Sequence, residues 1–450
     1  MSVQFGDSRL ASSNPWAVGG RGAPGEDVRI PTERYYSKDF FELECNSLWN
    51  NSWQVACRLE DIPKVGDYVE YTIVDQSILI VRDSETTIRA LWNRCSHRGV
   101  QLANGIGSFH GCQMVCPFHG WRYDLDGTCS YVYQAANAFS LESIEPEVVR
   151  IPECRTAIRW GFVFVNMNGQ AESLESFLEG ISTAIDPVGL EDMRVNWWRF
   201  TEVKANWKVA LEAFLEGYHI MQTHPELAQV SGDDYSAHLV YEVHDNGHGW
   251  NVQDPNNGGI DWWPARGISY TKWIFEQDRA MRVGVDGWLD DWILDLAESF
   301  ESKREPDAEM LGEYFQAVFE EAGRRGIPIR PMTPETSPFA FVFPNILVTA
   351  GPYGRTNVYR FRPNGLDPES ATIEVWAVQV RPIGAPEGPR PTREGPVPQG
   401  DLPFVLAQDA SNMESQQRGL RTHGFDHELL SGRYEPMIIN FNRTLDRLIG

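Results

Sequence analysis

Two short stretches of sequence decide the fold: Arg-Cys-Ser-His-Arg-Gly at residues 94–99 and Cys-Pro-Phe-His-Gly-Trp at residues 116–121. Each stretch contains one cysteine and one histidine, giving the pairs Cys95 with His97 and Cys116 with His119. Two thiolates and two imidazoles can hold a 2Fe-2S cluster, with the sulfur ligands on one iron and the nitrogen ligands on the other. The same set of side chains can also hold a single zinc ion.

The residues around these ligands favour the cluster over zinc. Gly99 and Gly120 allow backbone amides to approach a cofactor closely, and Pro117 stiffens its loop. Trp121 can shield the cofactor from water. Cys112 would be a fifth candidate ligand, so we interpret it as a buried structural thiol.

A second group of candidate metal ligands lies in residues 206–224. Helical spacing would place Glu212, Glu216 and His219 on one face, nearly opposite an apolar stripe. An ordinary amphipathic helix explains this pattern equally well. The histidine that follows makes a metal site the better interpretation.

Pro225 disfavours the α conformation of the residue before it, so the helix is expected to end before His224. The chain can then turn and bring the imidazole of His224 back beside His219. Two histidines and one carboxylate form the facial triad of non-haem Fe(II) oxygenases, which leaves positions open for O2. The carboxylate ligand must come from elsewhere in the chain.

Together the two groups resemble the Rieske non-haem iron ring-hydroxylating oxygenases, and in particular their α (catalytic) subunits of the α-only type. The resemblance covers nearly the whole chain in the expected order, because Asn-Trp-Lys at residues 206–208 and the His219 region follow the two cysteine-histidine loops. In that family the third iron ligand is an aspartate in a downstream helix with Glu and Gln after it. Asp409 matches this pattern, and Asp401 is a weaker candidate.

The resemblance implies a role for each candidate residue. A Rieske cluster would be held by Cys95, His97, Cys116 and His119, and a mononuclear Fe(II) by His219, His224 and Asp409. Glu216 and Glu212 are the expected catalytic carboxylates. Most members have an aspartate between the iron-ligating histidine and the Rieske histidine of the adjacent subunit, whereas this chain has Glu216. Some members that act on quaternary amines resemble this arrangement.

The composition excludes several classes of function. A formal charge of −24 and a pI near 4.8 oppose binding to nucleic acid or to an anionic membrane surface. The sequence lacks a signal peptide and any apolar run long enough for a membrane span, so we expect a soluble cytoplasmic protein. Seven cysteines without a secretory signal make a disulfide framework improbable.

Three parts are expected along the chain. Residues 1–50 form an N-terminal arm that packs on the catalytic domain, residues 51–165 form the Rieske domain, and residues 166–450 form the catalytic domain. Predicted strands are Tyr68–Val74, Ser77–Arg82, Thr87–Trp92, Trp160–Val165, Phe339–Val348, Asn357–Phe361 and Thr372–Arg381. Predicted helices are Ser37–Trp49, Leu174–Ile185, Asn206–Met221, Trp288–Ala322 and one beginning near Leu402.

The fold class is therefore α+β. The resemblance implies an antiparallel β domain for the cluster, and a larger domain with an antiparallel sheet flanked by helices in a helix-grip arrangement. A Pro/Gly-rich loop is expected over residues 382–400.

The function implied is the terminal oxygenase of a multicomponent system that hydroxylates or dihydroxylates a hydrophobic, aromatic substrate with O2. No dinucleotide-binding fingerprint is visible, so electrons from NAD(P)H would come through a separate reductase, with or without a ferredoxin. A homotrimer is expected. The alternatives are an N- or O-demethylase or quaternary-amine monooxygenase, and a Rieske electron carrier without oxygenase activity.

Phe214 and a group of tryptophans are expected to line the substrate pocket, although core packing explains most of the tryptophans. The group is Trp262, Trp263, Trp273, Trp288 and Trp292.

Overall fold

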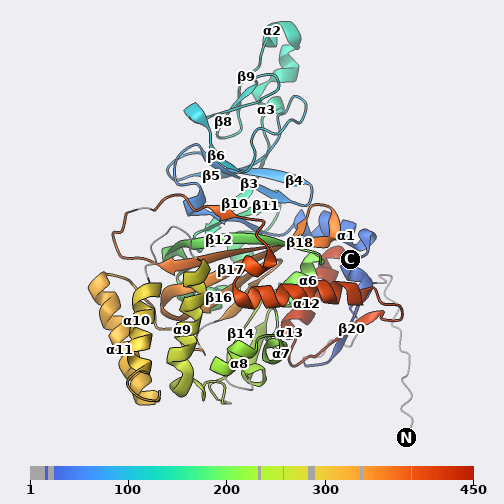
Figure 1. Ribbon diagram of the computed structural model, residues 1–450. Helices are drawn as coiled ribbons and strands as arrows, with labels where there is room; N and C mark the ends of the chain where they lie inside the picture. Colours follow the sequence, from blue (N-terminus) through green and yellow to red (C-terminus); the bar gives the residue numbers. More distant parts are fainter. Residues whose placement is uncertain are drawn as a thin grey trace.

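Two stacked β structures form the body of the molecule, with most of the helices below and beside them (Figure 1). The upper one, which we name the β module, spans residues 54–166, and the lower one is an eight-stranded main sheet. The computed structural model describes residues 16–18, 25–231, 235–256, 258–281, 289–334, 336, 338–386 and 388–450.

The β module contains a seven-stranded antiparallel sheet in the order β2-β11-β10-β5-β4-β3-β6. A three-stranded sheet, β7-β8-β9, lies beyond it. The strands are β2 (Gln54–Arg58), β3 (Asp67–Ile73), β4 (Gln76–Arg82), β5 (Ile88–Trp92), β6 (Ile106–Ser108), β7 (Gln113–Val115), β8 (Arg122–Asp124), β9 (Cys129–Tyr131), β10 (Glu153–Arg159) and β11 (Phe162–Asn166).

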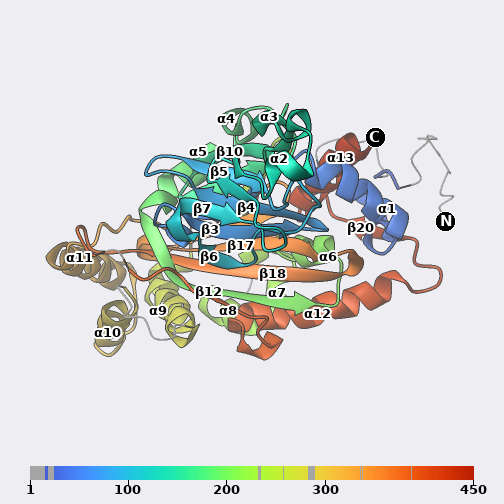
Figure 2. The ribbon, with the colours of Figure 1, turned by 90° about the horizontal axis from the view of Figure 1, so that it is seen from above.

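The main sheet has the order β13-β14-β15-β16-β17-β18-β12-β19, and only its last pair is parallel among the strands described. Its strands are β12 (Met193–Val203), β13 (Leu239–Val243), β14 (Gly249–Gln253), β15 (Phe339–Val342), β16 (Ile346–Gly351), β17 (Arg355–Asn364), β18 (Asp367–Val380) and β19 (Arg393–Glu394). Viewed from above, the β module lies over β17 and β18 (Figure 2).

Helices surround the main sheet on the face away from the β module and at both sides (Figures 1 and 2). They are α6 (Trp207–Glu212), α7 (Ile220–Thr223), α8 (Pro225–Ser231), α9 (Trp263–Met281), α10 (Asp290–Glu301), α11 (Ala308–Arg325), α12 (Phe404–Leu420) and α13 (Pro436–Ile449). Four single-turn helices occur earlier, α2 (Ala135–Ala138), α3 (Pro146–Val149), α4 (Leu174–Phe177) and α5 (Ser182–Ile185). No helix of the described part of the chain is long and apolar enough to cross a membrane.

The N-terminal segment lies against the C-terminal part of the chain. Strand β1 (Val28–Pro31) pairs with β20 (His427–Leu430), and α1 (Lys38–Leu43) follows it. The buried guanidinium of Arg34 donates to the carboxylate of Asp446 in α13 at 2.5 Å. The division of the chain at residues 50 and 165 stays a prediction.

The two faces of β17 point to different parts of the molecule, because side chains alternate along a strand. Arg360 donates to the carbonyls of Val55 and Ala56 in β2, at 2.7 and 2.9 Å, so this face meets the β module. Tyr359 and Phe361 face the other way and pack on Phe214, with ring centroids 5.1 Å apart in both cases.

A single buried carboxylate, Glu374 in β18, is the shared counter-ion of three guanidinium groups at this junction. It accepts hydrogen bonds from Arg360 at 3.0 Å, from Arg362 at 3.3 Å and from Arg393 at 2.5 Å. Burial opposes its charge, but the arginines hold its pKa far below the ordinary value. Since Arg360 and Arg362 also donate to backbone carbonyls of the β module, Glu374 stabilises the contact between the two β structures.

The predicted α+β class, with two antiparallel β structures and flanking helices, is confirmed. The three predicted strands in residues 68–92 and the two in residues 357–381 are present. The Pro/Gly-rich segment 382–400 is mainly a loop, although it contains the short strand β19.

Four predicted elements are wrong as single units. Residues 174–185 contain two single-turn helices, α4 and α5, because Gly180 adopts a positive φ of 86° between them. Residues 339–348 are a hairpin, β15 and β16, because Pro344 and Asn345 form the turn and Asn345 bonds back to the carbonyl of Phe361. Residues 288–322 contain two helices, because Pro306 interrupts them and Asp307 caps α11 by accepting from the amide of Met310 at 2.8 Å. Residues 206–221 do not form one helix, since α6 ends at Glu212.

Replacing Glu374 by Ala should lower the free energy of unfolding by about 3–5 kcal/mol, because three arginines would lose their buried counter-charge. Denaturant unfolding measures this change. The control is Glu309→Ala, which removes an exposed ion pair with Arg304 and should change stability by less than about 1 kcal/mol. Equal effects of the two substitutions would contradict the role assigned to Glu374.

Candidate metal centres

Residues 94–99 and 116–121, which we name the cluster loops, have the same backbone pattern. The amide of Cys95 donates to the carbonyl of Val100, and that of Cys116 donates to Trp121, both at 2.8 Å. Within each turn a glycine amide, of Gly99 or Gly120, donates back to the cysteine carbonyl. Both glycines have positive φ, 77° and 69°, which side chains rarely tolerate. The two loops are therefore matching turns that present one thiol and one imidazole each.

The side chains of the cluster loops converge as ligands of one cofactor would. Cys95 and Cys116 are buried, at 1% and 2% exposed. The Nδ1 atoms of His97 and His119 lie 3.1 Å apart. The lone pairs of two neutral imidazoles repel one another at this distance unless a proton or an ion lies between the two nitrogens. Burial, and then the positive charges of His119 and Arg98, hold the pKa of His97 below its ordinary value, which favours the neutral, ligating form.

Neighbouring side chains fix the orientation of the cluster loops. The ring of Trp121 stacks on His97 at 5.0 Å between centroids. The hydroxyl of Tyr123 lies 3.2 Å from Sγ of Cys95 and accepts from the amide of Ser96 at 3.0 Å. The interpretation of Cys112 as a buried thiol is wrong, because the turn after β6 leaves its side chain exposed.

The second group of candidate ligands is positioned by the interruption after α6. Residues 213–219 are not helical, and α7 begins only at Ile220, with His219 as its N-cap. The Gly217 carbonyl accepts from Ser236, and its amide donates to the hydroxyl of Tyr241 at 3.3 Å, which anchors the interruption. His224 ends α7 in a non-helical conformation before Pro225 begins α8, as predicted from the proline.

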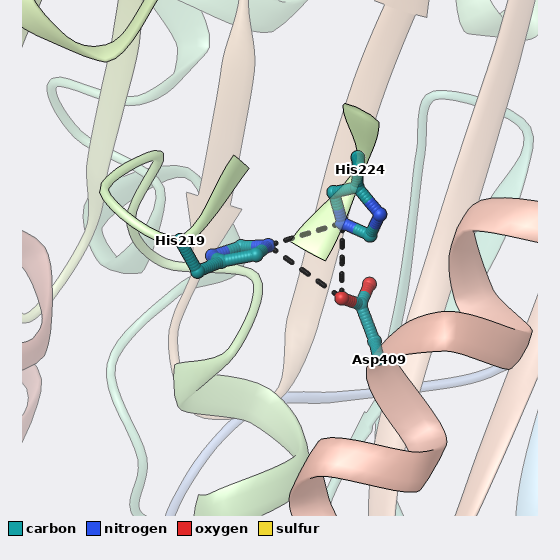
Figure 3. Close-up of side chains that lie close together, drawn as sticks. All are labelled: His219, His224 and Asp409. Atoms are coloured by element: carbon teal, nitrogen blue, oxygen red, sulfur yellow. Dashed lines mark hydrogen bonds and ion pairs between the residues drawn. The ribbon is translucent and has the colours of Figure 1, made fainter. Parts of the chain in front are cut away.

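His219, His224 and Asp409 point toward one another from the His219 turn, the end of α7 and the middle of α12 (Figure 3). The Nε2 atoms of the histidines are 3.2 Å apart. Oδ1 of Asp409 lies 3.0 Å from Nε2 of His224 and 3.5 Å from Nε2 of His219. Each residue thus offers one ligand atom to the same point, and we name these three residues the triad. His224 and Asp409 are buried, and His219 is partly exposed.

The second nitrogen of each triad histidine is held by a neighbouring oxygen. Nδ1 of His219 lies 2.5 Å from Oε1 of Glu216, and Nδ1 of His224 lies 2.8 Å from Oε1 of Gln408. Burial lowers the pKa of His219, but the hydrogen bond and charge of Glu216 and the charge of Asp409 raise it above its ordinary value overall. With Nδ1–H donated to these oxygens, both Nε2 lone pairs face the shared point.

The expectation that Glu212 lies on the ligand face beside Glu216 and His219 is wrong, because the helix does not continue past Glu212. The Glu212 carboxylate accepts instead from the hydroxyl of Tyr35 and from the amide of Asn442, both at 2.8 Å. Burial, and then the charge of Glu428, raise the pKa of Glu212 to about 8. The structure does not bring Glu212 to the triad.

The other candidates from the sequence, Asp401 and the tryptophans, also lie outside the triad or outside the described residues. Asp401 is exposed in the turn before α12. Trp262 and Trp263 line a cavity of only about 30 Å³, so they pack on one another and on Tyr270 and do not enclose a broad pocket. Trp288 lies outside the described residues.

Comparison with known families is consistent with both groups of ligands. The family model for the Rieske [2Fe-2S] domain matches residues 52–145. The model for the catalytic domain of the ring-hydroxylating α subunit matches residues 190–450, which is more than half of the chain. The chain belongs to the ring-hydroxylating α-subunit family.

Individual relatives of this α subunit include both monooxygenases and dioxygenases. The carnitine monooxygenase oxygenase subunit of Escherichia coli (strain K12) is 31% identical over 204 residues, which are 45% of this chain and 54% of that protein. The chain thus spans about half the length of the curated relative it matches.

Two solved structures share the fold. One is a quaternary ammonium Rieske monooxygenase in complex with L-carnitine, with a TM-score of 0.64 and 18% identity over 93% of this chain and 95% of the other. The other is naphthalene 1,2-dioxygenase from Rhodococcus sp., with a TM-score of 0.64 and 17% identity over 94% of each chain.

A Rieske 2Fe-2S cluster and a mononuclear iron are characteristic of this family, as the sequence predicted. The residues of the α subunit fit both groups, because the cluster loops supply two buried thiols and two facing imidazoles, and the triad supplies two imidazoles and one carboxylate. Gln408 was not found from the sequence. Its position next to Asp409 is the only signal that could have indicated it.

Replacing Asp409 by Ala should deplete the mononuclear iron and leave the visible absorbance of the Rieske cluster unchanged, since the cluster loops are separate from the triad. Metal analysis and a visible spectrum of the same sample measure both quantities. The matched control is Asp401→Ala, which should retain the iron. Full iron content in the Asp409→Ala protein would show that the third iron ligand is a different residue.

Replacing Gln408 by Leu should weaken iron binding by about 10–100-fold, because Nδ1 of His224 would lose the oxygen that orients its ring. Gln408→Glu keeps that oxygen and should restore most of the affinity. Iron titration of the metal-depleted protein measures the change. Equal affinities of Gln408→Leu and wild type would contradict this positioning role.

Proposed function

We propose that the chain is the terminal oxygenase component of a multicomponent Rieske system, which oxidises a small organic molecule with O2. The observation that carries this proposal is the convergence of His219, His224 and Asp409 on one point. Iron held by two histidines and one carboxylate keeps positions open for O2. A Rieske electron carrier would need only the cluster loops, so the triad argues against that alternative.

The electrons would come from NAD(P)H through a separate reductase, with or without a ferredoxin. The sequence has no dinucleotide-binding fingerprint that could accept a hydride directly. Because that reductase would draw on the cellular NAD(P)H pool, we place the system in the cytoplasm.

For the substrate, we propose a quaternary amine that is monooxygenated at a carbon bound to the nitrogen. The C–N bond of the hydroxylated carbon then breaks and the substituent leaves as an aldehyde, while the second oxygen atom of O2 leaves as water with two electrons from NAD(P)H. The similarity to carnitine monooxygenase supports it, as does the glutamate at position 216. Aromatic rings attract cations, and Phe214 and Tyr359 offer such rings near the triad. Burial raises the pKa of Tyr359 above its ordinary value, and the charge of Asp409 adds to this rise. The net charge of −24 favours a cation as well.

Hydroxylation of an aromatic substrate is the second candidate. The same rings of Phe214, Tyr359 and Phe361 could pack against an apolar ring, and the fold is as similar to naphthalene 1,2-dioxygenase as to the quaternary ammonium enzyme.

A substrate panel with the reconstituted system should separate the two candidates. We expect carnitine or glycine betaine to be consumed together with O2 and NADH, and one N-substituent to be released stoichiometrically as an aldehyde. Naphthalene and benzoate should give no hydroxylated product. Conversion of the aromatic compounds alone would reject the quaternary amine and support the second candidate. Product formation by the Asp409→Ala protein would reject the proposed role of the triad.

We further propose that the active form is a homotrimer in which the cluster loops of one subunit adjoin the triad of the next. Support comes from the shape of one chain, since β8 and β9 stand at the opposite end of the molecule from α7 in Figure 1. The tip that carries the cluster loops also exposes large apolar side chains, including Phe118 and Tyr133. Glu216 would then hydrogen-bond to His219 and to His119 of the partner subunit.

Changing Glu216 to Ala should leave both metal centres loaded and yet reduce product formation by about 100-fold or more, because no carboxylate would connect His219 with His119 of the partner subunit. Rapid mixing of reduced protein with substrate and O2 follows oxidation of the cluster by its absorbance. Glu202→Ala, an exposed acid in β12, is the control with normal rates. Oxidation of the cluster at the wild-type rate in Glu216→Ala would reject the bridge.

A further inference from the structure

A cleft of about 730 Å³ lies where the β module meets the edge of the main sheet. One wall comes from the end of β2 and the residues after it, including Arg58, and the other from β12 and the loop that leads to β19. None of the cluster-loop or triad residues lines it. We name it the arginine cleft, because its lining includes Arg58, Arg82, Arg194, Arg381 and Arg390.

The positive charge of the arginine cleft is only partly compensated. Among the described residues, its lining has five arginines against three glutamates. Glu60 pairs with Arg58, and Glu394 pairs with Arg199 outside the lining. Arg82, Arg194 and Arg390 direct their hydrogen bonds to backbone carbonyls and have no ion pair with a carboxylate of the described residues. In a chain with a net charge of −24, such a concentration of cationic groups favours an anionic ligand.

Three buried donors of the lining residues also lack partners. They are Nη1 of Arg58, Nδ2 of Asn196 and Nε1 of Trp197, on residues that are 2%, 7% and 6% exposed. None of the three atoms has a hydrogen-bond partner among the described residues. Buried donors are normally satisfied because an unmade hydrogen bond destabilises the fold. Because these three atoms are enclosed by protein, the partly exposed guanidinium groups of Arg82, Arg194 and Arg390 are the donors that a ligand in the cleft can reach.

Apolar residues of the lining can contact the hydrocarbon part of an organic ligand. Leu59, Trp198, Met281, Pro389 and Pro391 contribute to it. The volume lies within the range of about 300–1,000 Å³ that small-molecule sites have in proteins. A bare inorganic anion would fill only a small part of this space.

We propose that the arginine cleft binds a small organic anion, a carboxylate or phosphate on an apolar body, at a site separate from both metal centres. The acidic group accepts hydrogen bonds from the partly exposed guanidinium groups, in particular those of Arg82 and Arg194, while the apolar body lies against Trp198 and the prolines. Because its two walls belong to the β module and the main sheet, the ligand also holds these two parts together.

Calorimetric titration of the metal-loaded protein tests this site, with benzoate and benzyl phosphate as probes and benzamide as the neutral match for benzoate. We expect at least one of the two anions to bind at one equivalent per chain, and benzamide to bind at least tenfold more weakly. Arg194→Gln and Arg82→Gln should each weaken binding of that anion about tenfold or more, because each removes a cationic group. Arg421→Gln replaces an exposed arginine that does not line the cleft, so it should not change the affinity for the anion.

The titration of Asp409→Ala separates this site from the iron site. Unchanged binding of the anion to Asp409→Ala supports the arginine cleft, whereas loss of binding there would assign the anion to the triad and overturn the proposal. The proposal is also overturned if neither anion binds, if benzamide binds as tightly, or if folded Arg194→Gln and Arg82→Gln bind as wild type does. The result does not depend on turnover, so it stands apart from the proposed oxygenase function.

Discussion

The Glu374 carboxylate and its three arginines are the constraint on which the rest of the architecture depends. A charge buried so deeply is tolerated only with its counter-ions in place, and two of the three, Arg360 and Arg362, also bind carbonyls of the β module. The same strand, β17, presents Tyr359 and Phe361 on its other face toward Phe214. One central strand therefore fixes the β module on one side and the surroundings of the triad on the other.

The triad depends on an interruption of the helix more than on the helix itself. If α6 continued, His219 would follow the helical repeat, but the turn over residues 213–219 lets it face His224 from the start of α7. Glu216 and Gln408 then fix the ring orientations by holding the opposite nitrogens. The cluster loops show the same principle with glycine turns, since Gly99 and Gly120 allow the tight bends that place each histidine beside its cysteine.

The sequence predicted the parts of these sites that depend on local chemistry. Pro225 indicated where the helix ends, and the spacing of the cysteine-histidine pairs indicated the cluster loops. Asp409 lies far from the histidines along the chain and was found only through the family resemblance. Glu212 was misplaced because helical periodicity cannot show that tertiary contacts, such as that of Ser236 with Gly217, interrupt a helix. Neither the arginine cleft nor the Glu374 network has a local pattern, because both join strands that are distant in sequence.

We expect one chain to hold two iron centres, one in the cluster loops and one in the triad. Analysis of iron, zinc and acid-labile sulfide in the purified protein, together with its visible spectrum, measures the content of both centres. Two loaded centres would give about three iron atoms and about two sulfides per chain, with visible absorbance that decreases on reduction. Zinc without labile sulfide would contradict this expectation.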